Sequence, residues 1–238
     1  MNIQDFTKDF DRTFPIAKRS DASTLYNARF LRRWFDPCPT VQGMSSIKKL
    51  KLLKKAYSFL PPDECYLEIG TFVGKSLIAA MLKNEPRKTY ACDNFSQFND
   101  VSSEKILLQH LQTYGLKEFV TFYNNDFRLI LHPQYIKEPI GLYLYDGAHD
   151  FDSQYQAITQ VEHLLADHAL VIVDDWRFAD DSHSYAKAGT LKAIKESSNR
   201  FELLYDLPAR FNGDHATWWN GVAVFAFHRQ VKNGTGKS

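Results

Sequence analysis

The sequence predicts an α/β fold in which one mostly parallel sheet is covered by helices on both faces. Short apolar runs alternate with segments of helical periodicity along most of the chain, which is typical of parallel strands joined by crossover helices. The last two apolar runs, residues 201–205 and 222–227, have no helical segment between them. They can therefore pair as an antiparallel hairpin. A glycine-containing turn follows the first run, at the place where open α/β sheets bind ligands.

Length and composition are those of one globular domain with additions. The chain has 238 residues, 44% of them hydrophobic and 24% charged, with a formal net charge of +1, which gives no general attraction to nucleic acid or acidic membranes. No apolar run reaches the about 20 residues that a membrane helix needs. The N-terminus has no basic region followed by an apolar stretch. We therefore expect a cytoplasmic protein, with its three cysteines buried as free thiols.

The spacing of apolar residues predicts each element in turn. Residues 1–45 are aromatic, basic and punctuated by prolines, which favours short helices and loops. A helix begins at Ser46, because apolar residues recur at helical spacing as far as Leu60 and two prolines follow. The lysines between positions 48 and 55 are interpreted as its solvated face.

Strands and helices then alternate. The expected strands before the hairpin are 65–69, 89–92, 119–123, 140–145 and 169–173. Helices are expected over 75–83, around 106–111, around 157–165 and through 191–194. With the hairpin, this predicts a single Rossmann-like, doubly wound sheet of seven strands. We divide the chain into a helical cap or lid (1–60), a main domain (61–230) and a disordered tail (231–238).

The glycine turn has the sequence Glu68-Ile69-Gly70-Thr71-Phe72-Val73-Gly74-Lys75-Ser76. Its two glycines let the backbone turn sharply and approach a ligand closely, and the helix that follows directs free N–H groups towards that ligand. A phosphate-binding loop needs four residues between its glycines, where this chain has three. A dinucleotide motif needs glycine at position 72. Both motifs, and a purely structural turn, remain as alternatives.

Polar residues follow the next two strands. Asp93 and Asn94 end the second strand, and Asn125-Asp126-Phe127 follows the third. A carboxylate at the end of the second strand can accept hydrogen bonds from both hydroxyls of a ribose. Each acid alone could equally cap a helix, but three acids at successive strand ends favour a ligand site.

A second acidic group follows the fourth and fifth strands. Asp146-Gly147-Ala148-His149 ends the fourth, and Asp174-Asp175 ends the fifth. These ends are neighbours in a parallel sheet, so the carboxylates converge and need protons, hydrogen bonds or a cation. Carboxylate oxygens suit Mg²⁺ or a similar hard ion. The alternatives are a metal-free site that only orients a substrate, and a structural role for the histidine.

Glu-x-Gly-x-x-x-Gly at the end of a first strand resembles motif I of the class I S-adenosylmethionine-dependent methyltransferases. Asp-Gly-x-His followed by Asp-Asp resembles the metal-dependent O-methyltransferases of natural-product sugars, over roughly residues 40–230. The resemblance implies that His149 is the general base and that Asp146, Asp174 and Asp175 bind Mg²⁺ or another divalent cation. The S-adenosylmethionine site that it implies consists of Glu68, Gly70, Thr71, Phe72, Gly74, Ser76, Asp93, Asn94, Asn125, Asp126, Phe127 and Asp146.

One feature of that family is missing. Some of its sugar O-methyltransferases recruit a further glutamate from a neighbouring segment or subunit, and around Ser46-Ile47-Lys48 this chain has no acid. The occupancy of the metal site and the quaternary arrangement are therefore left open.

The predicted function is metal-assisted O-methylation of a small hydroxylated molecule, a sugar or a phenolic natural product. One alternative is a metal-independent methyltransferase acting on nitrogen or another acceptor, and another is a nucleotide-binding or non-catalytic module on the same fold. We expect a small-molecule partner, neither nucleic acid nor membrane, and leave homo-oligomerisation open. Segments 20–40 and 176–220 are expected to form the acceptor pocket, with the following candidates to line it: His183, Tyr185, Arg210, His215 and Trp218.

Overall fold

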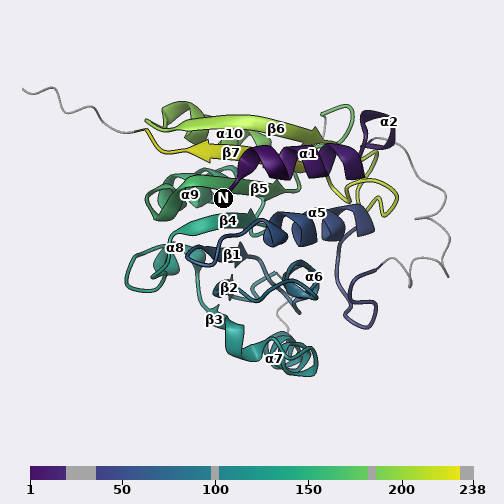
Figure 1. Ribbon diagram of the computed structural model, residues 1–238, viewed down its shortest axis with the longest axis vertical. Coiled ribbons are helices and arrows are strands. Elements are labelled where there is room, and N and C mark those ends of the chain that lie inside the picture. Colours follow the sequence, from purple (N-terminus) through teal and green to yellow (C-terminus); the bar gives the residue numbers. More distant parts are fainter. Residues whose placement is uncertain (20–35, 98–101, 182–185, 231–238) are drawn as a thin grey trace, which may run out of the picture.

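A seven-stranded sheet runs through the part of the chain that the computed structural model describes, residues 1–19, 36–97, 102–181 and 186–230 (Figure 1). The strands are β1 (Cys65–Ile69), β2 (Thr89–Asp93), β3 (Val120–Asn124), β4 (Ile140–Tyr145), β5 (Leu165–Asp174), β6 (Arg200–Leu207) and β7 (Val222–His228). Their order across the sheet is β3-β2-β1-β4-β5-β7-β6. The first five are parallel, and β7 pairs antiparallel with both β5 and β6. The predicted sheet with its C-terminal antiparallel hairpin is confirmed.

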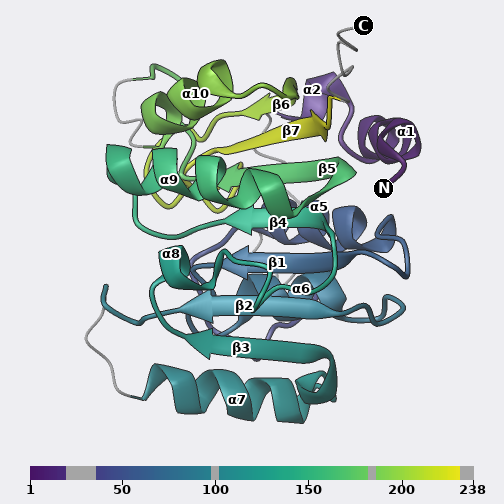
Figure 2. The same cartoon turned by 90° about the vertical axis from the view of Figure 1, so that its left-hand side faces the viewer.

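Helices cover both faces of this sheet (Figure 2). They are α1 (Ile3–Thr13), α2 (Ile16–Arg19), α5 (Ile47–Ser58), α6 (Lys75–Met81), α7 (Ser103–Thr113), α8 (Phe127–Ile130), α9 (Phe151–Val161) and α10 (Lys187–Glu196), with short 3₁₀ helices η1 (Lys117–Phe119) and η2 (Glu162–Leu164). None of the helices in the described residues has the length and apolar character that crossing a membrane requires.

The central strands are apolar at nearly every position because both of their faces are covered. Every residue of β1 and of β4 is buried. Successive residues of β4 alternate between two cores: Leu142 and Leu144 pack with α5 and α6, whereas Tyr143 and Tyr145 pack with α9. Because helices cover both faces of the sheet, the ends of the parallel strands are left at the surface, where a ligand can bind.

Strand β5 begins earlier than the sequence predicts. The helix was expected to include Leu165, but η2 ends it at Leu164 and β5 begins at once. Leu165 then pairs with Ile140 of β4, and His168 pairs with His228 of β7. Short apolar runs of this kind fit a helix and a strand equally well. Here the pairing with β4 and β7 makes residues 165–168 part of the strand.

An aromatic cluster joins α1 to the C-terminal hairpin. The ring of Phe10 lies 4.0 Å from that of Tyr205, and the ring of Phe14 lies 5.3 Å from that of Trp218, centroid to centroid. Trp218 is fully buried in this cluster, and its indole N–H donates to the carbonyl of Arg19. The prediction that Trp218 lines the acceptor pocket is therefore wrong.

Candidate active site

A cavity of about 1260 Å³ opens at the carboxyl ends of the parallel strands. Among the residues predicted for the cofactor, metal and catalytic sites, Glu68 and Gly74 do not border it. The predicted site residues that do border it are Gly70, Thr71, Phe72, Ser76, Asp93, Asn94, Asn125, Asp126, Phe127, Asp146, His149, Asp174 and Asp175. Motifs that are scattered over about half of the chain thus meet around one space.

The two glycines of the turn have left-handed backbones, with φ of 86° at Gly70 and 91° at Gly74. A Cβ on Gly70 would lie 1.9 Å from the carbonyl oxygen of Asp146. That carbonyl is fixed, because the Asp146 N–H donates to the carbonyl of Ile69 at 2.9 Å. Gly70 is therefore required for the close approach of the ends of β1 and β4, as well as for any approach to a ligand.

Glu68 lies behind the turn, where it is fully buried. Its carboxylate accepts hydrogen bonds from the hydroxyls of Tyr66 and, at 2.7 Å, of Ser76 at the start of α6. Burial raises the pKa of Glu68 to about 8, since removal from water disfavours the charged form. The contact with Ser76 joins the end of β1 to the start of α6, so Glu68 orders the turn from behind it.

This buried carboxyl makes the stability of the fold depend on pH. The folded protein holds the Glu68 proton up to a pKa of about 8, whereas the ordinary pKa is 4.5. Stability is therefore expected to be greatest below pH 4.5 with respect to this group, and to fall as the pH rises towards 8. Glu68→Gln is expected to remove most of that decrease in the free energy of unfolding, which is on the order of a few kcal/mol. Urea unfolding between pH 5 and about 8.5 measures it, and Glu85→Gln, at an exposed site, should keep the wild-type dependence.

Asp93 connects the end of β2 to two loops. Its Oδ2 accepts the N–H of Phe72 and its Oδ1 accepts the N–H of Phe95, each at 2.7 Å. Both phenylalanines have positive φ, 47° and 53°, a conformation that costs energy and tends to occur at functional sites. Each carboxylate oxygen keeps a second lone pair for a ligand hydroxyl.

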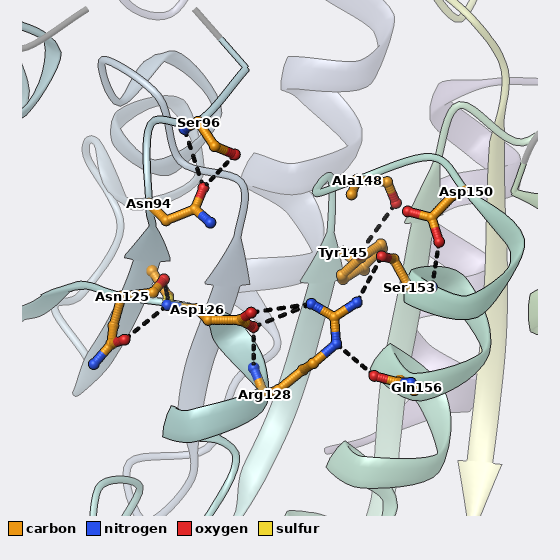
Figure 3. A network of polar contacts seen from close by, with 11 residues as sticks. Asn94, Ser96, Asn125, Asp126, Arg128, Tyr145, Ala148, Asp150, Ser153 and Gln156 are labelled. Atoms are coloured by element: carbon orange, nitrogen blue, oxygen red, sulfur yellow. Dashed lines mark hydrogen bonds and ion pairs between the residues drawn. The ribbon is translucent and has the colours of Figure 1, made fainter. Parts of the chain in front are cut away.

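Polar contacts fix the segment after β3 (Figure 3). Asp126 caps α8 by accepting the N–H of Arg128 at 2.9 Å, and it also accepts from the Arg128 guanidinium at 3.1 Å. The same guanidinium donates to Ser153 at 2.8 Å and to Gln156, both on α9. Helix capping thus accounts for the contacts of Asp126, while the nearby ring of Phe127 forms part of the cavity wall.

The acidic cluster forms as predicted. Asp146, Asp174 and Asp175 each place a carboxylate oxygen within 4.8 Å of the others. Burial raises the pKa of Asp146 to about 6, and the neighbouring Lys49 opposes that rise. The carboxylate of Asp175 lies 3.0 Å from Nδ1 of His149, which is an ion-pair distance without the alignment of a hydrogen bond.

Lys49 reaches this cluster from α5. Its Nζ donates to Oδ2 of Asp146 at 2.9 Å and also to Oδ2 of Asp174. Lys48 and Lys49 are only 2% and 1% exposed, so the interpretation of these two lysines as part of a solvated face is wrong. Lys49 lies one turn before the buried Leu53, and residues four apart share a helix face. That spacing indicates a lysine on the buried face of α5, but other lysines of the helix share it, so it does not single out Lys49.

The rest of the cavity wall comes largely from the loops after β5 and β6. Of the acceptor-pocket candidates, Arg210 borders the main cavity and His215 a smaller neighbouring one, whereas His183 and Tyr185 lie outside the described residues. Arg210 is held by Asp214 through two hydrogen bonds of 2.7 and 2.9 Å. The sequence analysis did not name Phe95 or Arg128 as lining residues. It expected segment 176–220 to form the pocket but did not single out the residues of that segment that line the cavity, Phe178, Asp180, Phe211 and Trp219.

A family model described as a methyltransferase domain matches residues 67–176, from the second half of β1 to the residue after the Asp174-Asp175 pair. These residues form a methyltransferase domain. The matched segment holds the whole glycine turn, and it holds the acidic cluster apart from Lys49. No curated protein sequence matches this chain.

Solved structures share the fold of this chain. Cofactor-bound Rv0187 from MTB is 18% identical, with a TM-score of 0.59 over 97% of this chain and 99% of its own. The O-methyltransferase TomG from Streptomyces achromogenes, involved in tomaymycin synthesis and solved with SAM, is 17% identical, with a TM-score of 0.57 over 96% and 100%. An rRNA methylase from Streptococcus thermophilus is 15% identical, with a TM-score of 0.52 over 76% and 94%. The fold is thus that of S-adenosylmethionine-dependent methyltransferases, and it is shared by enzymes with different acceptors.

Proposed function

We propose that this methyltransferase transfers the methyl group of S-adenosylmethionine to a hydroxyl of a small molecule. The observation that carries the proposal is the meeting of the glycine turn, Asp93 and the His149–Asp175 pair around one cavity. The proposed cofactor-binding region and the proposed proton acceptor thereby share one space, as methyl transfer requires.

The cofactor is proposed to lie along the ends of β1, β2 and β3. The turn at Gly70 would face the methionine part, because its backbone borders the cavity without a side chain. Asp93 would accept hydrogen bonds from the ribose hydroxyls through its second lone pairs. Asn125 and the ring of Phe127 would meet the adenine, with the amide giving polar contact and the ring an apolar surface.

His149 is proposed as the general base. Its side chain is 35% exposed and borders the cavity, while that of Asp175 is only 11% exposed. The carboxylate can hold the imidazole in one orientation and stabilise its protonated form, as in other histidine–aspartate pairs. The acceptor oxygen would bond to the methyl carbon as the carbon–sulfur bond breaks, and its proton would pass to Nε2 of His149. The products are a methyl ether and S-adenosylhomocysteine.

The donor set does not fit a divalent metal in this structure. Two of the three carboxylates that would bind the ion, those of Asp146 and Asp174, instead bind the ammonium of Lys49. The third, that of Asp175, contacts His149. The proposed transfer therefore contains no step that depends on a metal.

Aromatic residues in the cavity wall indicate the kind of acceptor. Phe178, Phe211 and Trp219 border the cavity, and flat aromatic side chains favour a ring-shaped partner such as a phenol or a sugar. Methylation of nitrogen is the second candidate, because it needs no metal and the contacts of Lys49 with Asp146 and Asp174 favour a site without one. The likeness to TomG, an O-methyltransferase, favours oxygen.

Calorimetric titration with S-adenosylhomocysteine and, separately, with ATP tests the cofactor. We expect binding of the first and none of the second, whereas the reverse result would favour a nucleotide-binding module. Transfer of a labelled methyl group from S-adenosylmethionine to panels of phenols, sugars and amines then tests the acceptor. Label that enters only the amines would overturn the hydroxyl assignment.

A further inference from the structure

We propose that the ammonium of Lys49 is the resident cation of the acidic cluster, so that the methyltransferase works without a divalent metal. We further propose that Lys49 donates a hydrogen bond to the acceptor oxygen. The second part rests on the proposed function, whereas the first concerns the cluster alone. Lys49 thus becomes a residue that decides metal dependence as well as the position of the acceptor.

The burial of Lys49 and Asp174 supports the first part of the proposal. The side chains of Lys49 and Asp174 are 1% and 2% exposed, and charged groups this far from water persist only when they are paired. Lys49 provides that pairing for two acids at once, with Nζ 2.9 Å from Asp146 and in contact with Asp174. The position of this positive charge is therefore set by the fold, through the Ser46 cap that begins α5.

The position of the Lys49 ammonium also opposes metal binding. A Mg²⁺ ion bound to these acids would lie about 2.1 Å from their oxygens, in the space where Nζ of Lys49 lies between Asp146 and Asp174. An ammonium and a metal cannot occupy that space together. Asp175 offers no second place, because its carboxylate faces His149 at 3.0 Å. Metal binding would thus require the buried lysine to leave both of its partners.

The ammonium of Lys49 keeps one N–H donor for a ligand. A lysine ammonium has three N–H donors, and two of those on Lys49 are directed at Asp146 and Asp174. Lys49 also borders the cavity, so its remaining N–H can reach an acceptor oxygen. Oδ1 of Asp174 is buried without a hydrogen-bond partner among the described residues, which leaves it to accept from a ligand hydroxyl. A positive charge beside the attacking oxygen would favour the loss of its proton to His149.

Mn²⁺ binding, followed by electron paramagnetic resonance, tests the first part without reference to catalysis. We expect no bound Mn²⁺ in the wild type or in Lys49→Arg, which keeps a cation in place. Lys49→Ala opens the space and leaves Asp146 and Asp174 without a counter-charge, so it is expected to gain a bound Mn²⁺. Lys54→Ala, on the same helix with its Nζ on the carbonyl of Leu82, is the matched control and should bind none.

Turnover with and without a chelator tests the second part. The wild type is expected to be unaffected by EDTA. Lys49→Ala with EDTA should be slower by about 100-fold, the effect of removing one hydrogen-bond donor at a reacting oxygen, and Mn²⁺ should restore part of the rate. Lys49→Ala with an unchanged rate would overturn the donor role.

Bound Mn²⁺ in the wild type, with turnover that EDTA abolishes, would overturn the whole proposal. If Lys49→Ala does not fold, the wild-type measurement still decides, and Lys49→Met combined with Asp174→Asn removes the two opposite charges together. That double variant should bind no Mn²⁺ and should resist EDTA, and a metal-dependent rate in it would contradict the proposal. Failure of S-adenosylhomocysteine binding with the Mn²⁺ results intact would refute the proposed function alone.

Discussion

His149→Ala is expected to slow methyl transfer by about 10²- to 10⁴-fold, the usual contribution of a general base. Binding of S-adenosylhomocysteine should stay unchanged, because His149 lies at the acidic cluster beside Asp175 and away from the proposed ribose and adenine contacts. Single-turnover rates and calorimetry on the same preparations separate the two effects. Part of the rate should return at high pH, as the acceptor loses its proton without help.

A matched control is His163→Ala, at an exposed position on η2, which should behave as the wild type. If His149→Ala keeps both its rate and its pH profile, another group takes the proton. If it loses cofactor binding as well, the histidine has a structural role instead.

Asp93→Ala is expected to weaken S-adenosylhomocysteine binding by about 100-fold, or about 3 kcal/mol, the value of two hydrogen bonds to a charged group. Part of that loss would come from the loops, because Asp93 also accepts the N–H groups of Phe72 and Phe95. Calorimetric titration measures the loss, and circular dichroism shows whether the fold is retained.

The ribose contact can be separated from loop ordering with the 2′-deoxy form of S-adenosylhomocysteine. The wild type should bind this analogue more weakly than the parent compound, whereas Asp93→Ala should bind the two alike. Asp126→Ala, at the end of the next strand, is the control and should still distinguish them. Equal affinities in the wild type would remove Asp93 from the ribose.

The strands and most helices could be predicted because each depends on a local apolar pattern. β1 and β4 are apolar at nearly every position because both of their faces are covered, and α9 repeats its buried residues at helical spacing. Ligand-type residues at the strand ends could be predicted as well, because parallel strands bring their carboxyl ends to one edge. Thirteen of the predicted site residues accordingly border the cavity.

Lys49 could not be predicted in the same way. Its partners Asp146 and Asp174 are 97 and 125 residues away, so no local pattern separates it from the lysines around it. Whether a lysine on an amphipathic helix is solvated or buried depends on what the opposing element offers, and that is known only once α5 is placed against the strand ends. The prediction that Trp218 lines the acceptor pocket was wrong for the same reason, since its partner Phe14 belongs to the distant N-terminal segment.

The left-handed backbone of Asp175, with φ of 50°, restricts which amino acids this position can accept. Consecutive residues of a strand point to opposite faces, yet the carboxylates of Asp174 and Asp175 lie in one cluster, because the chain leaves the strand at this residue. Glycine, asparagine and aspartate adopt such a backbone most readily, whereas other residues lose about 1–2 kcal/mol there. An alanine at position 175 would therefore combine backbone strain with the loss of charge, and an alanine scan would overstate the importance of the carboxylate. Asparagine removes the charge alone, so it is the substitution from which the contribution of this carboxylate can be measured.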